Sequence, residues 1–174
     1  EPTRLDSIRN VVAQKYPDSD LGMQLVADRI ARGKDTATQV RAFESMLAKD
    51  SAHRSGAFLE LHQRLFSIYA AQKDSTKALY HARYIAAEKG NPRIATTWKS
   101  LAQTMLNNNF SLDTARYYAQ MALTNAEKFP VGVIRYFPET GHIIPYADDS
   151  TRNAVYSTAR GNMLSIIGLI DLQQ

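Results

Sequence analysis

The sequence predicts an all-α fold built from antiparallel helix pairs. The first observation is the stretch 65–82, where two runs of apolar residues at helical spacing flank a polar break at 73–75. Two helices joined by so short a turn must pack against each other. The second observation is that a related pattern returns at 101–119. With 174 residues and 44% hydrophobic content, the chain is predicted to form a single domain over 1–174.

Three helices are expected in the N-terminal part, at about 3–16, 19–32 and 36–49. The first ends before Pro17, because proline disfavours the helical conformation of the residue that precedes it. Ser19 and its aspartate neighbours offer N-caps to the second helix, and Gly33 closes it. Asp35 begins the third helix.

Four further helices follow a polar, aperiodic connection, at about 57–72, 75–89, 93–107 and 112–128. The break at 73–75 supplies an N-cap between the first two of them. Gly90-Asn91-Pro92 gives a stop signal where the second should end, and Pro130 is expected to end the last. The helix at 93–107 contains the only tryptophan.

Helical periodicity breaks in an insertion at about 130–149, where β-forming residues surround the turn Pro138-Glu139-Thr140-Gly141. This pattern predicts a β-hairpin or an ordered loop at about 130–147. Because an isolated hairpin is marginally stable in water, its apolar side is expected to lie on the helices. A last helix at about 150–174 follows, with Asp148-Asp149-Ser150 at its start as capping residues.

A repeat relates the helix pair at 65–82 to the pair at 101–119. Leu65 and Tyr69 correspond to Leu101 and Met105, and the pair Ala78 and Ala82 returns 37 residues later as Ala115 and Ala119. This period is close to the roughly 34 residues of tetratricopeptide repeats, which these segments resemble. A third copy begins at Ile167-Gly168 and stops. Phe66 and Ala102 depart from the family pattern, which has glycine there.

The resemblance implies a right-handed α-solenoid whose first helices line a concave, peptide-binding groove. It places seven polar residues on that face: Glu60, Gln63, Ser67, Thr96, Lys99, Gln103 and Asn107. Ordinary solvated helix faces are the alternative explanation for each of them. Lys99 and Asn107 are the preferred candidates, because such side chains can hold a carboxylate or a peptide backbone.

Composition argues against several other classes of protein. Lysine and arginine exceed aspartate and glutamate by 21 to 17, but the basic residues are scattered, so no nucleic-acid partner is expected. No stretch is apolar for long enough to predict a membrane span. The chain has no cysteine, which removes disulfides and thiolate chemistry.

No catalytic or cofactor motif is present, so no cofactor, metal or catalytic residue is predicted. The four histidines show no metal-ligand spacing, although His62 and His81 fall on adjacent helices. An alternative hypothesis is a ligand-binding or enzymatic pocket between the insertion and the helices. Its polar groups would be Arg135, Tyr136, His142 and Tyr146.

The predicted function is a non-catalytic scaffold that binds a protein or peptide and belongs to a longer chain. Because the last helix is apolar on more than one side, we expect further chain or another subunit to cover it. The alternative is the N-terminal accessory region of a bacterial cell-envelope protein whose thioredoxin-like, redox-active domain lies beyond Gln174. The start at Glu1-Pro2 is consistent with a processed chain, which favours a periplasmic or cell-envelope location.

Overall fold

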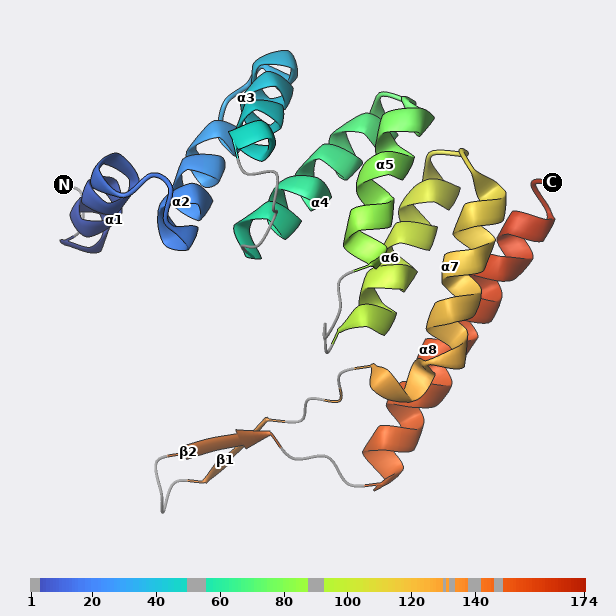
Figure 1. The fold of residues 1–174 in the computed structure, drawn as a ribbon. Coiled ribbons are helices and arrows are strands. Elements are labelled where there is room, and N and C mark those ends of the chain that lie inside the picture. Colours follow the sequence, from blue (N-terminus) through green and yellow to red (C-terminus); the bar gives the residue numbers. More distant parts are fainter. Residues whose placement is uncertain are drawn as a thin grey trace. The chain divides into compact units, whose positions relative to one another are not determined.

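The computed structural model describes residues 4–49, 56–87, 93–129, 131, 134–137, 142–145 and 149–174. Across these residues the chain forms eight α-helices, which confirms the predicted all-helical character (Figure 1). It divides into two compact units, Glu1–Ile85 (unit 1) and Ala86–Gln174 (unit 2). The single domain expected over 1–174 stays a prediction.

Unit 1 is built from five successive helices, α1 (Arg4–Lys15), α2 (Asp20–Ala31), α3 (Thr36–Lys49), α4 (Gly56–Ala71) and α5 (Ser75–Ala86). Predicted caps start three of them. The Ser19 side chain accepts a hydrogen bond from the Gly22 amide of α2, and the Asp35 carboxylate accepts from the Ala37 amide of α3. Asp74 caps α5 through the Lys77 amide. These bonds satisfy amides that have no partner within the helix.

The helices of unit 1 pack as neighbours in the sequence, with α4 also lying against α2. The core of α3 and α4 is made by Phe43, Leu61 and Leu65, all nearly or fully buried. Among the described elements α1 packs on α2 alone. Its apolar residues Leu5 and Ile8 therefore stay exposed, although their spacing follows the helical period.

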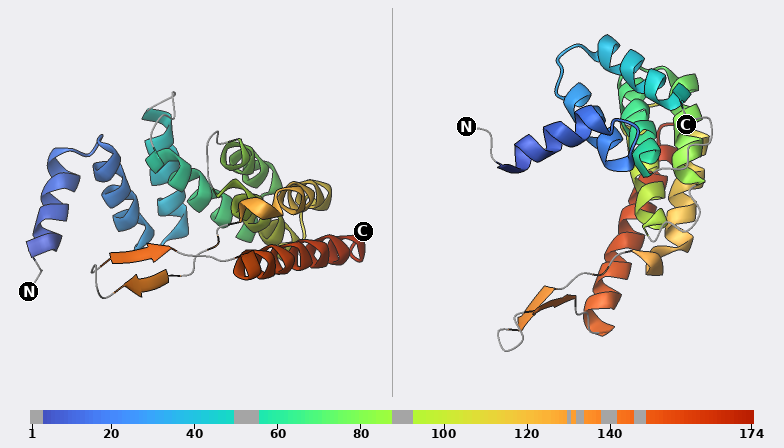
Figure 2. Two further views of the ribbon diagram at one scale, coloured as in Figure 1. Left: turned by 90° about the horizontal axis from the view of Figure 1, so that it is seen from below. Right: turned by 60° about the vertical axis from the view of Figure 1, so that its left-hand side comes forward.

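Unit 2 contains α6 (Ile94–Asn107), α7 (Leu112–Thr124), a short 3-10 helix η1 (Ala126–Lys128) and α8 (Asp149–Asp171). The helix α7 lies between α6 and α8 and contacts both, and the ribbon views show α8 running alongside it (Figures 1 and 2). Alanines fill much of the α6 and α7 interface, and α8 adds Met163, Ile166 and Ile170 to the core.

The helix α7 ends earlier than the predicted boundary at about residue 128. It stops at Thr124, and η1 occupies the residues that were expected to complete it. At this end, the Met121 carbonyl accepts both from the side-chain amide of Asn125, at 2.8 Å, and from its backbone N–H, at 3.2 Å. Bonds of the 3-10 type follow, from Lys128 N to the Asn125 carbonyl and from Phe129 N to the Ala126 carbonyl.

Two short strands, β1 (Ile134–Phe137) and β2 (His142–Pro145), pair in antiparallel register with Ile134 opposite Pro145. The turn between them and the side chains at 132–148 lie outside the described residues. The expected packing of a hairpin or loop at about 130–147 on the helices therefore stays a prediction.

Candidate functional site: two helix-lined grooves

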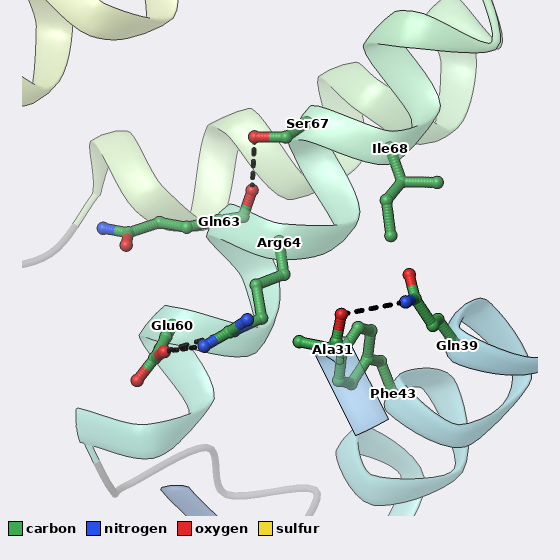
Figure 3. A pocket seen from close by; sticks show the side chains of 8 residues that line it. All are labelled: Ala31, Gln39, Phe43, Glu60, Gln63, Arg64, Ser67 and Ile68. Atoms are coloured by element: carbon green, nitrogen blue, oxygen red, sulfur yellow. Dashed lines mark hydrogen bonds and ion pairs between the residues drawn. The ribbon is translucent and has the colours of Figure 1, made fainter. Parts of the chain in front are cut away.

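A groove in unit 1 lies on the polar side of α4. We call it the α4 groove; its volume is about 410 Å3, and it is lined by Ala31 of α2, Gln39 and Phe43 of α3, and Glu60, Gln63, Arg64, Ser67 and Ile68 of α4. Three of these residues, Glu60, Gln63 and Ser67, were predicted from the repeat pattern. The structure therefore brings the unit 1 candidates together around one cavity (Figure 3).

An ion cluster closes one end of the α4 groove. The Arg64 guanidinium donates from Nη2 to Glu60 Oε1 at 2.5 Å and to Asp28 Oδ1 of α2 at 2.6 Å. All three side chains remain partly exposed, at 27% for Arg64, 37% for Glu60 and 48% for Asp28. Two carboxylates against one guanidinium leave a formal excess of one negative charge here. Because these side chains are exposed to solvent, the ion cluster contributes little to the stability of the fold.

The remaining polar groups of the α4 groove differ in how far their hydrogen bonds are satisfied. Gln39 Nε2 donates to the carbonyls of Ala31 and Gly33, at 3.1 and 2.6 Å, and so finishes the C-terminal end of α2. Ser67 Oγ donates to the Gln63 carbonyl at 3.0 Å. The Gln63 side chain is exposed and points away from Gln39 (Figure 3). Gln63 thus offers the freest amide of the groove.

A second groove, the α6–α8 groove, lies within unit 2 and has a volume of about 330 Å3. It is lined by Lys99 of α6, by Phe129, and by Ala154, Val155, Thr158, Ala159 and Asn162 of α8. Lys99 forms no ion pair with any residue that the structure describes. A cation with no partner carboxylate, set beside apolar side chains, can attract an anionic group.

The other unit 2 candidates do not line this groove. Gln103 Nε2 donates to Asn107 Oδ1 at 2.8 Å, so these two amides are engaged with each other along α6. The Thr96 hydroxyl oxygen is buried and has no hydrogen-bond partner among the described residues. Of the four residues predicted on α6, Lys99 lines the α6–α8 groove.

A buried cluster of histidine and tyrosine side chains between α4 and α5 was not predicted. His62 and His81 place their Nδ1 atoms 2.8 Å apart, with 2% and 5% of each residue exposed. Tyr84 stacks on His62, and Tyr69 stacks on His81. The sequence signal was limited to the placement of both histidines on one predicted helix pair. It did not reveal that their rings meet.

Tyr69, the most buried tyrosine of this cluster, is hydrogen-bonded to a carboxylate. The Tyr69 hydroxyl donates to Glu44 of α3, and Lys77 Nζ lies 3.8 Å from the same carboxylate. Burial, together with the hydrogen bond to Glu44, raises the pKa of the Tyr69 phenol well above its ordinary value. Burial lowers the pKa of His81 to about 4. Both side chains therefore stay neutral at neutral pH.

The alternative pocket at the insertion falls mainly outside the described residues. The backbones of Arg135, Tyr136 and His142 lie in the two strands, but their side chains are not among those described, and Tyr146 is not described at all. That pocket stays a prediction. Among the described residues, no group of three or more His, Cys, Asp or Glu side chains is arranged to hold a metal ion. None of the described helices has the length and apolar character of a membrane span.

Comparison with known proteins gives no assignment. No protein-family model matches the chain, and no match is found among the curated proteins or the solved structures. The resemblance to tetratricopeptide repeats therefore rests on the repeat pattern of the sequence, and the structure adds eight helices packed as sequential pairs.

Proposed function

We propose that this chain is a non-catalytic scaffold of the tetratricopeptide type, in which the polar face of α4 in unit 1 and that of α6 in unit 2 each bind a protein or peptide segment. The observation that carries the proposal is the α4 groove, because the three residues assigned to a binding face by the repeat pattern line the same cavity. The α6–α8 groove supports it, since Lys99 was assigned in the same way.

The chemistry of the two grooves suits a peptide. In the α4 groove, Ile68 offers apolar surface for a side chain, while Gln63 can donate to and accept from a peptide backbone. In the α6–α8 groove, Lys99 can bind a carboxylate beside Val155 and Phe129. The α6–α8 groove thus combines an apolar surface with few polar groups, as binding sites usually do, whereas the α4 groove is lined mainly by polar side chains.

The test is peptide selection with the full chain. Peptides that bind the wild-type chain are selected from a random library displayed on phage, and their affinities are measured by calorimetry. The double substitution Lys99→Ala, Asn107→Ala and the single substitution Gln63→Ala should each weaken binding by about tenfold or more, as loss of a central contact does. Circular dichroism checks that the helices remain.

Exposed residues outside both grooves supply matched controls. Gln120→Ala on α7 and Lys34→Ala after α2 remove the same kinds of side chain, and they should leave affinity unchanged. If the groove substitutions and the controls bind equally well, the grooves are not the binding surface. If no peptide is selected at all, the scaffold proposal loses its support.

The outer face of α8 is a further place for a partner in this proposal. Leu164 on α8 and Leu172 directly after it are 57% and 84% exposed, whereas Met163 and Ile166 of α8 are buried. Further chain or another subunit would cover these leucines. The alternatives, an accessory region of a cell-envelope thioredoxin-like protein and an enzymatic pocket at the insertion, stay predictions, because no described residue favours either.

A further inference from the structure

The contact between α4 and α5 includes a hydrogen bond between two imidazole rings. A neutral imidazole has one ring proton, and at 2.8 Å one Nδ1 must donate while the other accepts. His62 and His81 must therefore hold opposite tautomers. The bond persists as long as only one of the two Nδ1 atoms carries a proton.

A second proton at this contact has a large cost. When both rings are charged, both Nδ1 atoms carry hydrogens, so neither can accept and the bond is lost. Two positive charges then face each other at 2.8 Å in a site where 2% of His62 and 5% of His81 is exposed. Little water is present to screen them, so the charges repel strongly.

The groups around the pair do not remove this repulsion. The charged side chains that act on His81 are Glu44 on α3 and Lys77 on α5, which favour and oppose its charged form respectively. Glu44 is already engaged by the Tyr69 hydroxyl and lies 3.8 Å from Lys77.

Other titratable side chains lie near the pair in the described part of unit 1. Tyr80 and Tyr84 of α5 contact the rings, and hydrogen bonding between these two tyrosines, with burial, raises the pKa of Tyr80. From α2, the Asp28 carboxylate binds Arg64. Burial is thus the largest of the effects on the pKa of His81.

Protons can reach the pair from solvent. A cavity of about 570 Å3 lies between α3 and α5 and is lined by His81 together with Glu44, Leu47, Ala48, Thr76, Lys77 and Tyr80. His81 thus lines this cavity while its Nδ1 is engaged by His62. The imidazole pair is buried and still within reach of protons.

We propose that the His62–His81 pair is an acid-sensitive latch, which holds α4 against α5 while one Nδ1 is free to accept and releases them when both imidazoles are protonated. Release would separate α5 from the helix that carries the α4 groove, so a partner bound there would be lost on acidification. This second consequence rests on the proposed function, whereas the latch itself does not.

The first test is nuclear magnetic resonance of the wild-type full chain with 15N-labelled histidine. At pH 7 the two rings should show opposite tautomers and a scalar coupling between the Nδ1 atoms through the hydrogen bond. The coupling should vanish on acidification. Identical tautomers, or titration of both rings near the ordinary value of about 6.5, would overturn the latch whatever the chain binds.

The second test is hydrogen exchange at pH 7 and pH 5, corrected for the intrinsic pH dependence of exchange. With a pKa near 4 for His81 in the folded state and about 6.5 unfolded, opening of α4 and α5 should rise about 20-fold. His81→Gln keeps a hydrogen-bonding side chain without titration and should reduce this rise to below about threefold. Glu44→Gln should retain it, because Glu44 is not part of the pair.

Equal opening in wild type and His81→Gln would overturn the proposal. Should His81→Gln fail to fold, the coupling measured in the wild type decides alone. The coupling could also be lost on acidification while the affinity for the peptide stays unchanged. This result would support the latch and would count against the α4 groove as a binding surface.

Discussion

The two units hold their helices together by different means. In unit 1, polar side chains cross between helices: His62 meets His81, Tyr69 binds Glu44, and Arg64 binds Asp28. In unit 2, the contacts between helices are made mainly by apolar residues, including a series of fully buried alanines: Ala95, Ala102, Ala115, Ala119, Ala122 and Ala126.

This difference has a physical consequence. Small apolar residues let helices approach closely, and their packing does not depend on protonation. Buried polar contacts are stable only while every member keeps its partner, so they respond to pH and to the loss of one group. We therefore expect the stability of unit 2 to depend on the volume of its buried side chains. The stability of unit 1 should depend also on the charge of its buried polar groups and on close contacts between backbone segments.

The largest expected effect is the loss of core volume in unit 2. Met163→Ala empties a fully buried position on α8 and should lower the free energy of unfolding by about 2–5 kcal/mol. Leu164→Ala, on the next residue and 57% exposed, is the matched control and should change it by less than about 1 kcal/mol. Urea denaturation followed by circular dichroism measures both. Equal costs would show that the apolar core of unit 2 does not include α8.

The close contact between backbone segments in unit 1 can be tested by substitution of Gly22. A Cβ atom there would lie 1.8 Å from the Tyr16 carbonyl oxygen and 2.9 Å from Ser19 Oγ. Because backbone cannot move aside as a flexible side chain can, Gly22→Ala should cost about 3 kcal/mol. Native-state hydrogen exchange should show the loss in α1 and α2, with α6 to α8 unchanged. If the amides of α1 and α2 in Gly22→Ala are as well protected from exchange as in the wild type, the close approach of Gly22 to Tyr16 is contradicted.

The pH dependence should separate the two units. Burial lowers the pKa of His81 to about 4 in the folded protein, against about 6.5 when unfolded. The unfolded state therefore takes up the proton first, so the stability of unit 1 is complete above about pH 6.5 and falls as the pH falls toward 4. Between pH 7 and pH 5 the loss should be about 2 kcal/mol.

The measurement is the opening free energy from native-state hydrogen exchange, amide by amide. The amides of α4 and α5 should lose this stability, while those of α7 and α8, whose core is apolar, serve as the internal control. A uniform loss across both units would mean that general charge repulsion, and not His81, governs the response to acid.

The smallest effect should be a gain in unit 2. Gly168 lies on the exposed side of α8, and a Cβ atom there would meet nothing within 4 Å. Gly168→Ala should stabilise the chain by about 0.5–1 kcal/mol, because alanine restricts the unfolded chain and favours the helix. Thermal unfolding measures the gain. Destabilisation would indicate that another surface already packs against this face of α8.

Much of the local structure could be predicted from the sequence. The starts of α2, α3 and α5 follow from Ser19, Asp35 and Asp74, whose side chains make the expected capping bonds. The end of α7 could not be predicted in this way. The helical pattern of the sequence continues to about residue 128, and only the structure shows that a 3-10 turn replaces the last helical turn after Asn125.

The lining of the α4 groove shows what a sequence pattern can reach. The resemblance to tetratricopeptide repeats assigned Glu60, Gln63 and Ser67 to a binding face, and these residues form one wall of the groove; their role in binding stays a prediction. The other wall comes from α2 and α3, through Ala31, Gln39 and Phe43. Spacing within one helix carries no information about which distant residues will face it, so these were missed.

The helical character of the chain, the starts of most helices and the polar face of each follow from the sequence, because capping and periodicity act over a few residues. The hydrogen bond between His62 and His81 and the close approach of Gly22 to the Tyr16 carbonyl appear only in the folded chain. The same is true of the exposure of Leu5 and Ile8 on α1 and of Leu164 on α8. These outcomes depend on the distance and orientation between helices, which packing sets and local spacing does not encode.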